Sequence, residues 1–181
     1  MKIIAIIGMP GSGKDVAVQL LKKELDLDYI RMGDVVIEET KKRNLNISDE
    51  NVGQVANSLR EEHGMNAIAK LCIDKIRKSQ QKCVIINGVR GIEEIKYFRT
   101  HLKDLIIVGI HSAPRIRFER LVKRNREDDI KNEDEFNKRD ERELKWGIAD
   151  AFILADEIIC NQGTINELKG QLTVLLRKYN I

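Results

Sequence analysis

A glycine-rich segment near the N-terminus has the spacing of a phosphate-binding loop, G-x-x-x-x-G-K, with an apolar run before it and a helical pattern after it. Glycines let backbone N–H groups converge on phosphate oxygens, and the first turn of the following helix adds partial positive charge. A lysine at the end of the motif can neutralise the outer phosphates. We therefore predict a polyphosphate site made by Gly8, Met9, Pro10, Gly11, Ser12, Gly13, Lys14 and Asp15.

Asp15 stands where this motif usually has Ser or Thr. The usual hydroxyl ligates Mg²⁺, whereas a carboxylate beside a triphosphate is repelled unless a cation lies between them. Two interpretations stay open: Asp15 is a ligand of Mg²⁺, or it caps the first turn of the helix and points away. We take Asp15 as the predicted metal ligand.

Short, wholly apolar runs recur along the chain and predict strands that are buried on both faces, as in a parallel sheet. Helical patterns with polar faces separate them. This alternation is typical of a three-layer α/β fold with a five-stranded parallel sheet. The predicted strands are 2–7, 29–32, 83–86, 105–110 and 157–159; the predicted helices are 14–24, 34–43, at least two within 52–80, 92–101, 115–126, 133–149 and 165–179.

Two segments depart from the alternation. Residues 34–80 are mainly helical in pattern although one crossover helix would suffice there, so a helical insertion is predicted. Residues 125–135 are nearly all charged and fit either a solvated turn or a mobile lid. Opposite charges nearly balance between Arg115 and Lys145, which disfavours a nucleic-acid patch there.

The composition excludes several classes of protein. A length of 181 residues fits one domain, and a net charge of +3 is too small to indicate a protein that coats polyanions. Cys72, Cys83 and Cys160 lie far apart without a C-x-x-C pair, so no zinc site is expected and all three are predicted to be buried in a reducing compartment. The apolar runs are too short to span a membrane, which favours a cytoplasmic protein.

Other segments resemble the nucleoside monophosphate kinases, a group of P-loop proteins that includes adenylate kinases and, more distantly, dephospho-coenzyme A kinases. Met32-Gly33-Asp34 resembles the group's T-G-D turn at the mouth of the acceptor site. Asn87-Gly88-Val89-Arg90 resembles its D-G-x-P-R, one residue shorter and with Asn for Asp. The lid and the base-contacting loop of the group have likenesses in Arg120, Arg124, Arg126, Arg139, Asn161 and Gly163.

Two longer stretches, 87–99 (NGVRGIEEIKYFR) and 139–150 (RDERELKWGIAD), are similar to an archaeal adenylate-kinase-related family whose substrates are not established. The resemblance implies one P-loop kinase domain over 1–181. Its core would be 1–33, 81–123 and 140–181, with an acceptor-binding insertion at 34–80 and a lid at 124–139.

The resemblance also implies an activity: transfer of the ATP γ-phosphoryl, with Mg²⁺, to a nucleotide-like small-molecule acceptor. It assigns catalysis to Lys14, Arg120, Arg124, Arg126 and Arg139, donor binding to the loop with Asn161 and Gly163, and acceptor binding to Gly33, Asp34, Arg60, Asn87 and Arg90. The remaining cations of the lid region, Arg115, Arg117, Lys123 and Lys145, are predicted to be surface residues.

Some residues depart from the group's pattern. Glu38 stands where the group has an arginine for the acceptor phosphate; Arg60 can substitute, or it can be a solvated ion pair beside two glutamates. The group's strand-end Asp is Asn87 here, while a new carboxylate appears at Asp15. One hypothesis joins both changes: Asp15 has taken over the organisation of the metal.

Two other functions compete. Asn137-Lys138-Arg139-Asp140 spells the guanine-selecting N-K-x-D of GTPases, but it lies in a charged helical stretch and no D-x-x-G follows the third strand, so a switch GTPase is disfavoured. The second is a nucleotide-binding or ATP-hydrolysing regulatory protein without acceptor phosphorylation, since both metal-side positions deviate from the pattern.

Overall fold

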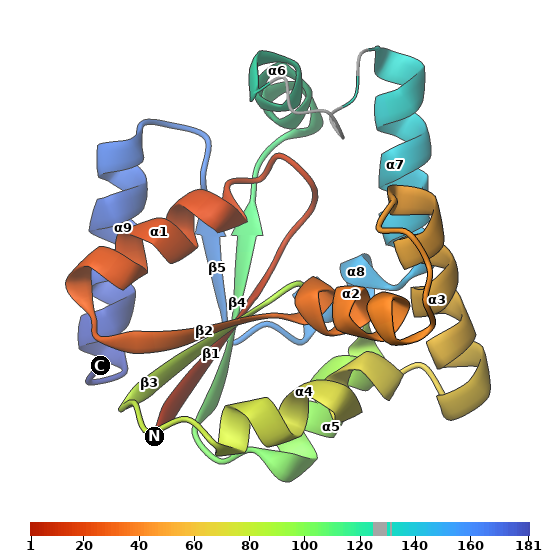
Figure 1. Ribbon diagram of the computed structural model, residues 1–181. Helices are drawn as coiled ribbons and strands as arrows, with labels where there is room; N and C mark the ends of the chain where they lie inside the picture. Colours follow the sequence, from red (N-terminus) through yellow and green to blue (C-terminus); the bar gives the residue numbers. More distant parts are fainter. Residues whose placement is uncertain (125–129, 131) are drawn as a thin grey trace.

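A computed structural model describes residues 1–124, 130 and 132–181, and its centre is a five-stranded parallel sheet (Figure 1). The strands lie in the order β2-β3-β1-β4-β5. Their bounds are β1 Lys2–Ile7, β2 Leu27–Arg31, β3 Cys83–Asn87, β4 Leu105–His111 and β5 Glu157–Cys160. The predicted three-layer α/β fold is therefore confirmed.

The apolar runs form strands because both faces of the sheet are covered. β3 is buried at every position, and β1 is buried from Ile3 to Ile7. On one face, α1 (Lys14–Glu24) and α9 (Ile165–Lys178) pack over Ile4, Ile6 and Ile85. On the other face lie α2 (Met32–Lys42), α4 (Ala67–Arg77), α5 (Ile92–His101) and α8 (Ile148–Ile153).

Three further helices stand around the carboxyl edge of the sheet. α3 (Asp49–His63) packs on α2 and α4, and buries Val55 and Leu59 in the same core. Beyond the end of β4, α6 (Pro114–Arg124) and α7 (Glu133–Lys145) rise above the sheet (Figure 1). Leu121, Ile130 and Phe136 form a small apolar cluster that ties these two helices together.

Some predicted elements differ from the observed ones. The predicted helix 133–149 is two helices, because Gly147 adopts a left-handed φ of 90° that ends α7 and starts α8. Met32 opens α2 instead of closing β2, and it is buried in the core. Cys72 and Cys83 are buried as predicted, whereas Cys160 is exposed because it lies on the sheet's edge strand.

Parallel pairing brings the chemistry-bearing loops to one edge. Ile6 of β1 lies opposite Asn87 of β3, so the glycine loop and the Asn87–Arg90 turn leave the sheet side by side. In open α/β folds, ligands bind outside the carboxyl ends of the strands, between loops of this kind.

The division of the chain into core, insertion and lid stays a prediction. Among the described residues, no helix has both the length and the apolar character needed to cross a membrane.

Candidate functional site

A cavity of about 720 Å³ opens at the carboxyl edge of the sheet. The glycine loop, the Asn87–Arg90 turn and helices α2, α3, α6 and α7 contribute to its wall. Cationic side chains outnumber carboxylates in its lining, while the α2 and α3 side carries apolar residues such as Val36, Val52 and Ala56. The cavity can therefore hold a strongly anionic ligand together with a partly apolar one.

At two positions of the loop, a side chain larger than that of glycine would clash with neighbouring atoms. A Cβ on Gly13, whose φ is +97°, would lie 2.2 Å from Asn161 Nδ2. A Cβ on Gly11, whose φ is +78°, would lie 2.7 Å from the Arg117 carbonyl oxygen. Only glycine fits such close approaches in this backbone conformation. The loop is therefore packed tightly against α6 and the end of β5.

Lys14 is held within the loop that it completes. Its Nζ donates to Gly8 O at 2.5 Å and to Met9 O at 3.0 Å. Burial lowers the pKa of Lys14 to about 8; the negative charges of Glu143 and Asp15 oppose this shift. An ammonium that has lost its hydration gains most from a bound anion, which is the requirement for gripping a phosphate.

Three side chains form a chain of hydrogen bonds that begins at a carbonyl oxygen of the loop. Asn161 Nδ2 donates to Ser12 O at 2.8 Å, and the Ser112 hydroxyl donates to the Asn161 carbonyl. Arg120 Nη1 in turn donates to Ser112 Oγ at 2.9 Å, and this predicted catalytic arginine lines the cavity together with the loop. Ser12 is fully buried, its N–H donates to Met9 O and its carbonyl accepts from Asn161, so in this structure neither its side chain nor its backbone faces the cavity as predicted.

Arg117 was expected on the surface, and that prediction is wrong. Its side chain is 4% exposed and makes a two-pronged contact with Asp140 of α7, at 2.8 and 2.6 Å. The same guanidinium donates to Ser112 O and to Pro10 O of the loop. The buried guanidinium of Arg117 therefore pairs with the Asp140 carboxylate and binds the loop carbonyl at the same time. Arg115, Lys123 and Lys145 are exposed as predicted.

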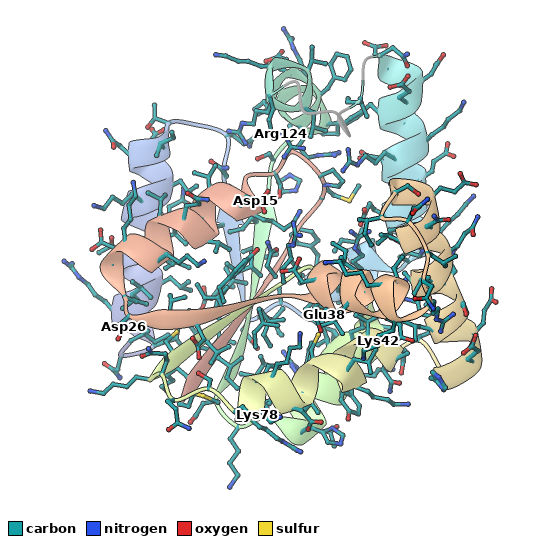
Figure 2. All side chains as sticks on the ribbon, viewed as in Figure 1. Asp15, Asp26, Glu38, Lys42, Lys78 and Arg124 are labelled. Atoms are coloured by element: carbon teal, nitrogen blue, oxygen red, sulfur yellow. The ribbon has the colours of Figure 1, made fainter. Side chains whose placement is uncertain are left out.

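Asp15 and Asn87 are hydrogen-bonded to each other beside the glycine loop, where the sequence predicted a metal. Asn87 Nδ2 donates to Asp15 Oδ1 at 3.2 Å and to the Tyr29 hydroxyl at 3.0 Å. Among the described residues, Asn87 Oδ1 is a buried oxygen without a hydrogen-bond partner. Arg124 Nη1 lies 4.0 Å from Asp15 Oδ2, and Figure 2 shows Arg124 directly above Asp15. A carboxylate and an orphan amide oxygen fit the oxygen ligands that Mg²⁺ prefers.

The wall of the cavity that carries the predicted acceptor residues Arg60 and Arg90 is centred on Trp146, the one tryptophan of the sequence. Arg90 lies over its ring at 4.7 Å and donates to Glu143 Oε1 at 3.0 Å. Arg142 and Arg60 approach the same ring at 5.4 and 5.6 Å. Guanidinium groups against an indole form cation–π contacts, so the ring holds three cations at one wall of the cavity.

Arg60 forms a buried ion pair with Glu94, and not a solvated ion pair with the glutamates beside it in the sequence. Its Nη2 lies 3.5 Å from Glu94 Oε1, and the other oxygen of Glu94 accepts from the Arg90 backbone N–H at 2.8 Å. Burial lowers the pKa of Arg60 and raises the pKa of Glu94. Glu94 therefore orients both Arg60 and the turn that carries Arg90.

The predicted site residues are largely brought together. The cavity is lined by most of the loop residues, Met9 and Ser12 being the exceptions, together with Gly33, Asn87, Arg90, Arg124, Arg139 and Gly163. Asp34 is exposed and pairs with Arg31, whose Nε lies 2.7 Å from it, and Arg31 rather than Asp34 lines the cavity. Glu38 contacts Lys75 of α4 instead. Arg126 lies outside the described residues.

Sequence reasoning missed several residues of this site. Ser112, Glu94, Glu143 and Trp146 contact predicted site residues, and Arg142 lines the cavity against Trp146. The sequence carries a signal for Arg142, Glu143 and Trp146. They lie three, four and seven residues after Arg139, which is the spacing of one helix face, so the prediction that Arg139 lines a cavity extends to them.

A family model described as an AAA domain (AAA_17) matches residues 7–137. The UPF0200 protein of Methanocaldococcus jannaschii is 45% identical to this chain, with 98% of this chain and 90% of that protein covered. The UPF0200 protein of Thermococcus onnurineus is 42% identical, with 97% of each covered.

Solved structures show the same fold. A shikimate kinase from Bacteroides thetaiotaomicron has a TM-score of 0.69 at 16% identity, covering 97% of this chain and 98% of its own. One from Acinetobacter baumannii, in complex with shikimate, has a TM-score of 0.62 at 15% identity, covering 98% and 94%. The resemblance predicted from residues 87–99 and 139–150 is confirmed at the level of family and fold: this chain belongs to the AAA domain family and to the UPF0200 proteins, and it has a P-loop kinase-like fold.

Proposed function

We propose that the protein is a kinase that transfers the γ-phosphoryl group of ATP to a nucleotide-like small-molecule acceptor. The observation that carries the proposal is one cavity with two cationic ends. The glycine loop and Lys14 form one end, and Arg60, Arg90 and Arg142 around Trp146 form the other. A single cavity of this kind suits two anionic reactants that must meet.

Phosphoryl transfer asks for positioning and charge stabilisation rather than covalent help from the protein. An acceptor oxygen bonds to the γ-phosphorus, the bond from that phosphorus to the β–γ bridging oxygen breaks, and ADP leaves. Lys14 and the loop hold the donor. Arg120, Arg124 and Arg139 line the cavity beside the loop, where they can stabilise the negative charge of the moving group. Arg90 and Arg60 orient the acceptor.

Asp15 and Asn87 are the residues that would hold Mg²⁺, through the carboxylate and the orphan amide oxygen. The ion would neutralise phosphate charge and make a carboxylate tolerable beside the donor. Asp15 also receives a hydrogen bond from Asn87 and faces Arg124, so its side chain points to the cavity rather than serving as a helix cap alone.

Replacing Asp15 with alanine is expected to reduce the Mg²⁺-dependent part of ATP affinity by about tenfold, because a metal ligand is lost. Asp15→Ser restores the hydroxyl of the usual motif and should regain most of that affinity. Calorimetric titration of ATP with and without Mg²⁺ measures both. Asp26→Ala, at an exposed position outside the site, is the matched control. If neither Asp15 variant alters the Mg²⁺ dependence, Asp15 has no role in holding the metal.

The proposed activity is tested by an acceptor panel. Protein, ATP and Mg²⁺ are mixed with each mononucleotide, with dephospho-coenzyme A and with shikimate, and ADP is measured. We expect one class of acceptor to stimulate ADP formation and to be recovered as its phosphorylated product. The shikimate arm addresses the substrate of the structural neighbours.

A second function, an ATP-binding regulatory protein without acceptor phosphorylation, draws on one observation. The strand-end carboxylate of the kinase pattern is Asn87, and the loop hydroxyl is Asp15. Tight ATP binding without stimulation by any acceptor would favour this function over the kinase.

A further inference from the structure

Arg90 already holds an anion in this structure. Glu143 of α7 is buried, lines the cavity and accepts a hydrogen bond from Arg90 Nη1 at 3.0 Å. The guanidinium of Arg90 also rests on Trp146. The cation that the proposed function gives to the acceptor is therefore engaged by a side chain of the protein itself.

The other buried carboxylate nearby has a different task. Both oxygens of Glu94 are used, by the Arg90 backbone N–H and by Arg60. Glu94 therefore fixes the conformation of the turn, and an incoming anion cannot easily displace its carboxylate. Among the described residues, the one hydrogen-bond partner of the Glu143 carboxylate is the side chain of Arg90, which lines the cavity and is 40% exposed. A change of partner at this pair leaves the fold of the turn intact.

The position of the pair within the cavity also matters. Glu143 lines the same cavity as Lys14 and Arg90; it contacts Arg90, and its negative charge also opposes the lowering of the pKa of Lys14. Arg142, one residue before it, lies over the same tryptophan ring. Three guanidinium groups, those of Arg60, Arg90 and Arg142, thus lie around Trp146 on this wall, and one of them is paired with the exchangeable carboxylate, so an incoming anion finds cations already gathered.

We propose that Glu143 is a specificity-determining residue of the acceptor site, which occupies Arg90 in place of an acceptor and yields it only to a stronger anion. The inference rests on the proposed kinase function and narrows its substrate class. A phosphate or carboxylate group forms charge-assisted hydrogen bonds with a guanidinium and can displace the carboxylate; a neutral hydroxyl compound cannot. The acceptor therefore carries an anionic group that binds Arg90.

The test uses binding rather than turnover. The donor end is first filled with a non-hydrolysable ATP analogue and Mg²⁺, and inorganic phosphate is then titrated at constant ionic strength while the fluorescence of Trp146 is followed. Glu143→Gln keeps the size of the side chain and removes the competing charge, so it should bind phosphate about tenfold more tightly than the unmodified protein. Glu141→Gln removes the same charge from an exposed position of α7 and should bind phosphate as the unmodified protein does.

Three results overturn the inference: phosphate binding that is unchanged or weaker in Glu143→Gln, the same tightening in Glu141→Gln, or no response of Trp146 to phosphate in any of the proteins. A second measurement needs no variant. Crystals of the unmodified protein with the ATP analogue and phosphate should show phosphate on Arg90 and the Glu143 carboxylate turned away. Phosphate bound elsewhere, with the Arg90–Glu143 contact kept, contradicts the proposal.

The two proposals can fail separately. A protein that shows the expected phosphate exchange yet forms no ADP with any acceptor refutes the kinase but keeps the exchange at Arg90. A protein that phosphorylates an acceptor while Glu143→Gln leaves anion binding unchanged keeps the kinase and refutes the role of Glu143.

Discussion

Lys14→Ala is expected to lower ATP affinity and turnover together by about 10²- to 10³-fold, the range found when one preorganised donor to a developing charge is removed. The ammonium is buried and bonded to Gly8 and Met9 carbonyls at the mouth of the loop. It is therefore positioned before the nucleotide arrives. Calorimetry gives the affinity, and ADP release with an active acceptor gives the turnover.

The pH dependence of ATP affinity in the unmodified protein is a second test of the role of Lys14. With a pKa of about 8, Lys14 is charged at pH 7.5 and largely neutral at pH 9 in the free protein. Bound phosphate favours the ammonium and raises that pKa, so binding at high pH must take up a proton. ATP affinity should then fall by roughly tenfold between pH 7.5 and pH 9. The fall should vanish in Lys14→Ala. A variant that binds and turns over ATP normally would refute the donor site.

Breaking the Arg117–Asp140 pair should have the largest effect on stability. Asp140→Ala leaves a guanidinium that is 4% exposed without its carboxylate. Removing one partner of a buried ion pair typically costs about 3–5 kcal/mol. Urea unfolding should therefore show a loss of that order, and ATP affinity should fall as well because Arg117 also supports the Pro10 carbonyl.

A matched control lies two residues earlier on α6. Arg115 pairs with Glu119, but its side chain is 90% exposed, so Arg115→Ala should change the free energy of unfolding by less than about 1 kcal/mol. Arg117→Met in the Asp140→Ala background should recover part of the loss, because no uncompensated cation remains. Equal costs for Asp140→Ala and Arg115→Ala would show that the inner pair contributes no more than a surface pair.

The sequence predicted the sheet and the phosphate loop well, because both depend on local patterns. A strand that is buried on both faces must be apolar throughout, as β1 and β3 are, and a loop that wraps phosphate needs glycines at fixed spacing. The start of α1 at Lys14 and the bounds of α5 follow from the same patterns.

The sequence did not predict which charged side chains of the helices are buried. Arg115 and Arg117 stand in the same charged segment, yet one is exposed and the other buried, because the difference comes from Asp140 on another helix. The burial of Arg60 likewise depends on Glu94, which is distant in the chain. Charge spacing along one helix carries no information about a partner that reaches it only after folding.

Arg117 touches both Pro10 of the donor loop and Asp140 of α7, the helix that also carries Arg142 and Glu143. One buried cation thus connects the two walls of the cavity that would face the proposed donor and acceptor. The gap across which a phosphoryl group would travel is set by a rigid, water-poor contact, so salt or crowding outside the protein should alter it little.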